Sequence, residues 1–170
     1  GEREQIEESL LNIFILKPTS FKEQEEAFDK LLKYVKSKDI SLIIIDSIAM
    51  LYRLELGAAI SNDDSGEIAR VNRKLANQLR ALNEIARKQN IPIIVTNQVY
   101  AQFNTGDEAQ LERKVSMVGG DLLKYWSKCL IELSQRGPRR KLSLKKHRSL
   151  PEKNFSFEIV NSGIVKKGIF

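Results

Sequence analysis

Several residue types are scarce in this chain of 170 residues, and each shortage excludes a class of protein. Cys129 is its one cysteine, which excludes a disulfide framework and a cysteine-rich metal site and favours a reducing compartment. His147 is its one histidine, so no second histidine supports a metal or catalytic role for it. No apolar run approaches the roughly 18 residues of a membrane-spanning helix, and a signal-peptide pattern is missing. We therefore expect a cytoplasmic protein without membrane contact.

The basic residues are concentrated in one segment. The net charge is +6, yet residues 136–148 contain seven Lys or Arg and no acid, while residues 1–135 carry −2. Such a block is typical of binding to a polyanion, either the phosphates of a nucleotide or a nucleic-acid backbone. A solvated hairpin turn is the equally open alternative.

Apolar runs predict a layered α/β fold. Residues 13–16, 41–46 and 91–97 are predicted strands, and the last two contain aliphatic runs of the kind that parallel sheets bury on both faces. Short apolar runs near the C-terminus, with "NSG" as a turn signal, predict a hairpin-rich edge. At 42% hydrophobic, the chain can bury one sizeable core, and we expect one domain over residues 1–170.

Two stretches with apolar residues at steps of three and four predict amphipathic helices. The first begins after Ser20, and Glu23 completes a capping box there. The second is about seven turns long and begins at Asp64 or Ser65.

Two segments rich in glycine and polar residues predict loops. They are residues 54–66 and 100–120, and a loop as long as the second is usually either functional or disordered.

Polar residues end two of the predicted strands. Asp46 and Ser47 follow one aliphatic run, and Asn97 and Gln98 follow the other. Ligands of open α/β sheets collect beyond the carboxyl ends of the strands. An acid there can hold the Mg²⁺ of a nucleotide while a neighbouring amide senses the terminal phosphate. The alternative is that Asp46 does not bind a ligand and only caps the turn that follows the strand.

The order of the motifs extends this interpretation. Four motifs follow one another over nearly the whole chain: "LIIIDSIAMLYR", "LANQLRALNEIARKQNIPIIVTNQVYAQ", "VGGDLLKYWSKCLIEL" and "LPEKNFSFEIVNSGIV". Together they resemble the core of the RecA-like recombinases, and within that family the archaeal RadB branch. The resemblance implies a RecA-like ATPase core, a mostly parallel sheet flanked by helices with a hairpin-rich C-terminal edge and without the N-terminal strands.

The resemblance also implies roles in binding ATP and Mg²⁺. Asp46 resembles the Walker B aspartate that acts on Mg²⁺ through water, with Ser47 beside it. Gln98 resembles the catalytic glutamine that couples the terminal phosphate to the DNA-binding loop. Arg3 resembles the arginine whose planar guanidinium covers the adenine ring.

Two loops match those that line the DNA path in a recombinase filament, residues 54–65 and 101–118. Within the second loop, the residues available for contact with single- or double-stranded DNA are Gln102, Phe103, Arg113 and Lys114.

The basic segment matches a stretch that touches the ATP of an adjacent subunit in the family. An acidic "DSP"-type sequence stands there in the main recombinases, whereas this chain reads "LKKHRSLPE". The resemblance implies that these residues reach a neighbouring nucleotide in trans: Lys145, Lys146, His147, Arg148 and Pro151. A basic strand that faces solvent or DNA is the alternative.

The phosphate loop G-x-x-x-x-G-K-[ST] does not occur in the 170 residues, since Gly119 and Gly120 precede Asp121 rather than Lys and Ser or Thr. In the family, this loop and the catalytic glutamate lie upstream of the matched region. Because the chain begins with Gly1 rather than Met, we expect a C-terminal part of a longer protein, a natural loss of the loop being the alternative. The chain alone is expected neither to bind ATP tightly nor to hydrolyse it.

These observations predict an accessory, ATP-dependent DNA-binding protein of homologous recombination and repair. Weak DNA-dependent ATPase activity is expected of the complete protein. Its expected partners are DNA and either the main recombinase or further copies of itself through the nucleotide interface. The alternatives are a RecA-fold signalling or assembly ATPase of the circadian-clock type, without DNA binding, and an inert interaction paralogue.

Overall fold

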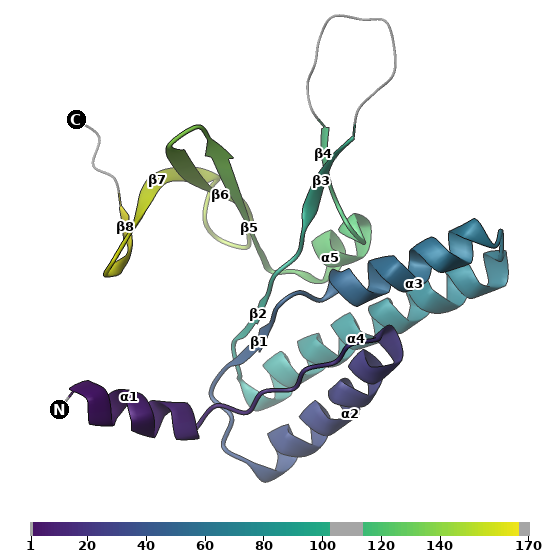
Figure 1. Ribbon diagram of the computed structural model, residues 1–170, viewed down its shortest axis with the longest axis horizontal. Coiled ribbons are helices and arrows are strands. Elements are labelled where there is room, and N and C mark those ends of the chain that lie inside the picture. Colours follow the sequence, from purple (N-terminus) through teal and green to yellow (C-terminus); the bar gives the residue numbers. More distant parts are fainter. Residues whose placement is uncertain (1, 103–113, 167–170) are drawn as a thin grey trace, which may run out of the picture. The chain divides into compact units, whose positions relative to one another are not determined.

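The computed structural model describes the backbone of residues 2–102 and 114–166, and the side chains of residues 4–99, 118–135 and 137–166 (Figure 1). The chain forms two compact units, residues 1–119 and 120–170. The elements of the first unit are α1 (Glu2–Leu11), α2 (Phe21–Ser37), β1 (Ile43–Ile45), α3 (Ala49–Ser61), α4 (Ser65–Gln89), β2 (Ile93–Val95), β3 (Val99–Gln102) and β4 (Lys114–Met117). Those of the second unit are α5 (Gly120–Trp126), β5 (Cys129–Arg136), β6 (Arg139–His147), β7 (Lys153–Val160) and β8 (Gly163–Lys166).

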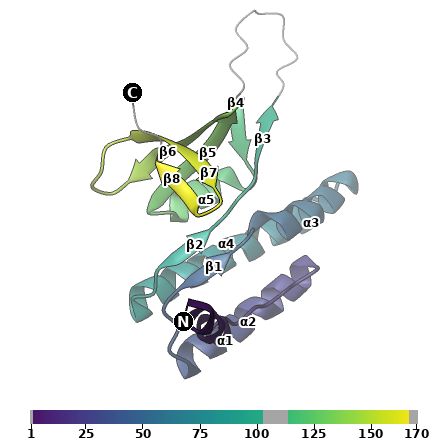
Figure 2. The same cartoon turned by 60° about the vertical axis from the view of Figure 1, so that its left-hand side comes forward.

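The first unit is built on a short parallel pair of strands. β1 pairs with β2 in the register Ile43 to Ile93 and Ile45 to Val95. α2 and α4 lie against this pair (Figure 2), where Val35, Ile43, Ile85 and Ile91 form a buried cluster.

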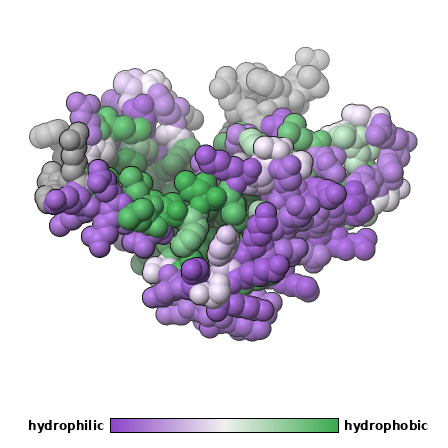
Figure 3. Space-filling model, turned by 60° about the horizontal axis from the view of Figure 1, so that its bottom comes forward, coloured by the Kyte–Doolittle hydropathy of each residue, from purple (hydrophilic) through white to green (hydrophobic). Residues whose placement is uncertain are grey.

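One face of this pair is exposed. Successive residues of a strand point to opposite faces, and Ile44 and Ile94 are 61% and 53% exposed. The prediction that both strands are buried on both faces is therefore wrong for this structure, because α2 and α4 cover one face. Exposed apolar side chains are green in Figure 3.

The two predicted amphipathic helices are confirmed. The Ser20 hydroxyl caps α2 by accepting the Glu23 backbone N–H, and Asp64 caps α4 by accepting the Glu67 N–H at 2.9 Å. α4 buries its apolar residues at steps of three and four, from Val71 and Leu75 to Ile85. These stripes are what hold the helices to the rest of the unit.

Three segments differ from the prediction. Residues 54–61 were predicted as a loop but belong to α3, and residues 62–64 connect α3 to α4. Residues 13–16 were predicted as a strand but are irregular and exposed, and among the described residues they have no partner strand. The predicted loop 100–120 contains β3 and β4, which form an antiparallel pair, while residues 103–113 lie outside the described part.

The second unit confirms the predicted hairpins. β5, β6, β7 and β8 form an antiparallel sheet in chain order, with a register shift between Leu130 and Ile131. Its turns contain Gly137 and Gly163, whose φ values of 58° and 122° favour glycine. The described β-structure is thus parallel only in β1 and β2.

Among the described residues, no helix combines the length and apolar character needed to cross a membrane.

Candidate functional site

Two polar residues meet at the carboxyl ends of β1 and β2. Asp46 follows β1 and Thr96 follows β2, and the Thr96 hydroxyl donates a hydrogen bond of 2.5 Å to Asp46 Oδ1. The Thr96 N–H donates to the Ile45 carbonyl at 2.9 Å, which continues the parallel ladder to this point. The pairing of the strands therefore fixes the position of the Asp46 carboxylate.

Asp46 is exposed rather than buried. The expected cost of a charge within an apolar run does not arise, because the strand ends before the carboxylate. The Asp46–Ser47 peptide bond is cis, and Ser47 is half-buried. An exposed carboxylate at this edge is available to a ligand from solvent.

The edge offers one exposed carboxylate, that of Asp46, as a ligand for Mg²⁺. Among the described residues, no group of three or more His, Cys, Asp or Glu could hold a metal ion. Mg²⁺ commonly takes one or two carboxylates and completes its shell with water and phosphate oxygens. The exposed Asp46 carboxylate suits that mode.

The turn after Asp46 is held from two sides. The Ile48 N–H donates to the Thr96 carbonyl at 3.3 Å. The Ile48 carbonyl accepts a bond of 3.1 Å from Gln24 Nε2, which also donates to Gln78 Oε1 at 2.7 Å. Ile48 is fully buried, and Gln24 and Gln78 are 4% and 5% exposed. The structure thus joins α2 and α4 to the turn that follows β1.

The sequence analysis did not single out Thr96, Gln24 or Gln78. Thr96 lies in the polar strand end that drew attention to Gln98. Gln24 and Gln78 stand at positions of the apolar stripes of α2 and α4, between Phe21 and Phe28 and between Leu75 and Leu82. A polar residue in an apolar stripe was the signal that could have found them.

The end of β2 is also tied to the end of β4. Asn97 Nδ2 donates to the Val118 carbonyl at 2.9 Å, and the Val118 N–H donates to the Gln98 carbonyl at 3.5 Å. Gln98 itself is exposed, and within the described residues no hydrogen bond joins its side chain to Asp46. The strand end that carries Gln98 therefore anchors the β3–β4 hairpin.

The side chains predicted to contact adenine and DNA lie outside the described part of the chain. The backbone places Arg3 in α1, Gln102 in β3 and Lys114 in β4, and the side chains of these three residues are not described. Phe103 and Arg113 lie outside the described residues altogether.

The basic segment belongs to the second unit, and several of its residues make local contacts. Lys145 forms an ion pair with Glu132 at 3.7 Å, and Lys146 Nζ donates to the Lys124 carbonyl at 2.6 Å. His147 Nδ1 accepts the backbone N–H groups of Ser149 and Leu150, at 3.1 and 3.0 Å.

These contacts give His147 a structural role in the turn after β6. Arg148 and Pro151 follow in that turn and are exposed.

Comparison with known proteins gives one consistent result. The Rad51 family model matches residues 4–167. The chain is 42% identical over 159 residues to a protein of Methanococcus maripaludis strain C7 named DNA repair and recombination protein RadB. Proteins of the same name from Methanocaldococcus jannaschii and Methanosphaera stadtmanae are 36% and 34% identical.

These matches cover 91–93% of this chain but only 62–66% of each relative. The chain thus spans less than two thirds of the length of the relatives that it matches.

Proposed function

Since the chain belongs to the Rad51 family, we propose that it serves ATP-dependent DNA binding in homologous recombination and repair, in an accessory role. The relatives are named as DNA repair and recombination proteins of archaea. Under this proposal both compact units are parts of one RecA-like core.

The observation that carries the proposal is the fixed carboxylate of Asp46 beside Thr96, at the carboxyl ends of a parallel strand pair. In α/β proteins this edge is where ligands bind. Asp46, with Ser47 beside it, would hold Mg²⁺ through water while ATP supplies phosphate oxygens. The bound ion would neutralise part of the charge of the phosphates.

Gln98 would report the state of the terminal phosphate to the DNA-binding hairpin. The bonds from Asn97 and Gln98 to Val118 support this role, because they connect the strand end of the nucleotide site to the end of β4. A change at Gln98 would therefore reach the hairpin through the backbone.

The remaining assignments follow from family membership. Arg3 would cover the adenine ring, and the DNA contacts would come from Gln102, Phe103, Arg113 and Lys114. The residues at the end of β6 would reach the nucleotide of an adjacent subunit, either another copy or the main recombinase: Lys145, Lys146, His147, Arg148 and Pro151. The local contacts of Lys145, Lys146 and His147 would then fix the shape of this segment.

The test of the nucleotide site is Asp46→Asn in the full-length gene product. We expect affinity for Mg²⁺-ATP to fall by about 10–100-fold, while ATP binding in EDTA is unchanged. The unfolding midpoint should stay constant, because the asparagine oxygen still accepts the Thr96 hydroxyl. Asp39→Asn, a change of an exposed carboxylate near the amino end of β1, is the control. An Asp46→Asn protein that binds Mg²⁺-ATP normally would contradict the proposal.

The test of DNA binding is the salt dependence of affinity for a single-stranded oligonucleotide. Arg113→Ala and Lys114→Ala should each weaken binding and lower the salt slope by about 0.7, since each cation releases counterions from the strand. Lys36→Ala, at an exposed position of α2, should change neither quantity. An absence of salt-dependent binding to the oligonucleotide would favour the signalling ATPase without DNA binding instead.

A further inference from the structure

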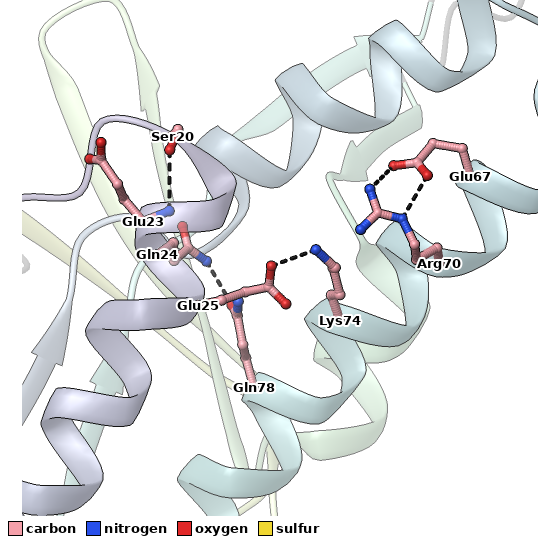
Figure 4. A network of polar contacts seen from close by, with 8 residues as sticks. All are labelled: Ser20, Glu23, Gln24, Glu25, Glu67, Arg70, Lys74 and Gln78. Carbon is pink, nitrogen blue, oxygen red and sulfur yellow. Dashed lines mark hydrogen bonds and ion pairs between the residues drawn. The ribbon is translucent and has the colours of Figure 1, made fainter.

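A buried pair of amides links α2 and α4 beneath the turn that carries Asp46. Figure 4 shows Gln24 of α2 and Gln78 of α4 facing each other. Gln24 Nε2 donates both to Gln78 Oε1 and to the Ile48 carbonyl. Gln24 therefore uses its donors on one side chain and on one backbone carbonyl two residues beyond Asp46.

We propose that Gln24 is a positioning residue for the Asp46 carboxylate, acting through the backbone of Ile48. This inference rests on the proposed role of Asp46 in binding Mg²⁺-ATP. The Ile48 N–H is bonded to the Thr96 carbonyl, and the Thr96 hydroxyl is bonded to Asp46. One series of hydrogen bonds thus runs from α2 through Ile48 and Thr96 to the carboxylate.

The helices do not need the amide pair for their attachment. Both helices also bury apolar side chains near these glutamines in sequence: Phe21 and Phe28 on α2, and Leu75 and Leu79 on α4. Apolar packing is non-directional, so apolar side chains at positions 24 and 78 would hold the helices together equally well. A hydrogen bond to the Ile48 carbonyl is directional and fixes where that carbonyl lies.

The pair is also incompletely satisfied. Among the described residues, Gln78 Nε2 is buried and has no hydrogen-bond partner. A buried donor without a partner lowers stability. Stability alone therefore does not explain a buried amide pair here, whereas the bond from Gln24 to the Ile48 carbonyl gives the Gln24 amide a specific use.

A separate contact joins the same helices nearer to solvent. Lys74 Nζ lies 2.5 Å from Glu25 Oε2 (Figure 4), and both side chains are partly exposed. This ion pair connects α4 to α2 without touching the turn after β1. Of these two links between α2 and α4, we therefore assign the positioning of the Asp46 carboxylate to the amide of Gln24.

The experiment compares Gln24→Met with Gln78→Met in the full-length gene product. Methionine is unbranched and fills the space of glutamine without a donor. Gln24→Met removes the bond to the Ile48 carbonyl. Gln78→Met keeps that bond and removes the bond between the two side chains together with the unpaired Gln78 Nε2. The readout is the ratio of ATP affinity in Mg²⁺ to that in EDTA.

We expect Gln24→Met to lower this ratio by about tenfold, because loss of a group that orients a metal ligand has an effect of this size. Gln78→Met should leave the ratio within about twofold of the unchanged protein. Hydrogen exchange of the Ile48 amide should accelerate in Gln24→Met while that of Leu79 in α4 is constant. Gln24→Asn, which keeps the amide but shortens its reach, is the second variant if methionine prevents folding. It should change the ratio in the same direction.

Asp46→Asn in the same series separates the two proposals. A normal ratio in Asp46→Asn would overturn the nucleotide site itself. A lowered ratio in Asp46→Asn with equal ratios in Gln24→Met and Gln78→Met would overturn the positioning role alone. A loss in Gln24→Met that appears equally in EDTA would also overturn it, because a general structural defect does not select for Mg²⁺.

Discussion

At the scale of single residues, Gly119 is required for two separate reasons. Its φ of 64° lies in the left-handed region, which a side chain disfavours. A Cβ atom added to it would also lie 3.1 Å from Leu75 Cδ2 and 3.7 Å from Tyr52 Cε1. Leu75 is buried and cannot move away easily, whereas the distance to Tyr52 is that of an ordinary contact.

Gly119→Ala should lower the free energy of unfolding by about 1–2 kcal/mol, mainly through the left-handed backbone. Gly57→Ala is the matched control, because it lies within α3 and its added Cβ would meet nothing within 4 Å. That control should raise the free energy of unfolding by about 0.5–1 kcal/mol. Urea denaturation measures both, and two changes of the same sign would contradict the explanation.

Part of the site could be predicted from single residues, and part could not. Asp46 and Gln98 became candidates because polar residues that follow aliphatic runs are visible in the sequence. The partners of Asp46 and Ile48 were not found, because Thr96 is 50 residues from Asp46 and Gln24 is 24 residues from Ile48. Contacts over such separations depend on how the elements pack.

At the scale of elements, the start of α2 depends on three hydrogen bonds of Glu23. Ser20 Oγ accepts the Glu23 N–H, and the Glu23 carboxylate accepts the Thr19 N–H at 2.7 Å and the Thr19 hydroxyl at 2.8 Å. A capping box normally returns to the N-cap residue, whereas here the carboxylate reaches the residue before it. The hydrogen bond from the Thr19 N–H, and then that from its hydroxyl, lower the pKa of Glu23 from its ordinary value.

Glu23→Gln should therefore reduce stability at neutral pH and have little effect in acid. The pKa of Glu23 is lowered on folding, so its contribution is complete above the unfolded pKa and is lost as pH falls through the folded pKa. Urea denaturation of both proteins at neutral pH and at about pH 3 measures the difference. Glu26→Gln, an exposed change on the same helix, is the control. A difference that persists unchanged in acid would contradict the role of the carboxylate.

The success of the fold prediction also varied by element. α2 and α4 were predicted because their buried residues form one stripe each. α3 was missed because it contains Gly57 and because its apolar residues do not form one buried stripe. Leu51, for example, is buried, whereas Leu54 is exposed. Residues 13–16 have the composition of a strand, but a strand also requires a partner, which composition does not report.

At the scale of the whole molecule, the second unit exposes an apolar sheet face. Leu133 lies opposite Leu142, Leu142 opposite Phe155, and Ile159 opposite Ile164, so these side chains share one face. Leu133 is 64% and Ile164 73% exposed. Contiguous apolar surface of this kind promotes association.

The 170-residue chain by itself should self-associate and bind the dye ANS. Leu133→Lys with Ile164→Lys should reduce both, because charges on this face oppose its burial. Val165→Lys is the control, since Val165 is exposed on the opposite face of β8. Analytical ultracentrifugation measures the association, and equal effects of Ile164→Lys and Val165→Lys would contradict the assignment to this face.

The contact between Asp46 and Thr96 also has a consequence for the order of folding. It closes a stretch of 50 residues that contains α3 and α4. Helices form from local contacts. Parallel strands that are distant in sequence pair more slowly, because closing the chain between them costs conformational entropy. The carboxylate therefore reaches its place only when the α3–α4 hairpin has formed and β2 has docked beside β1. A ligand held there would bind the finished unit and no earlier intermediate, so occupancy of the site would report that folding is complete.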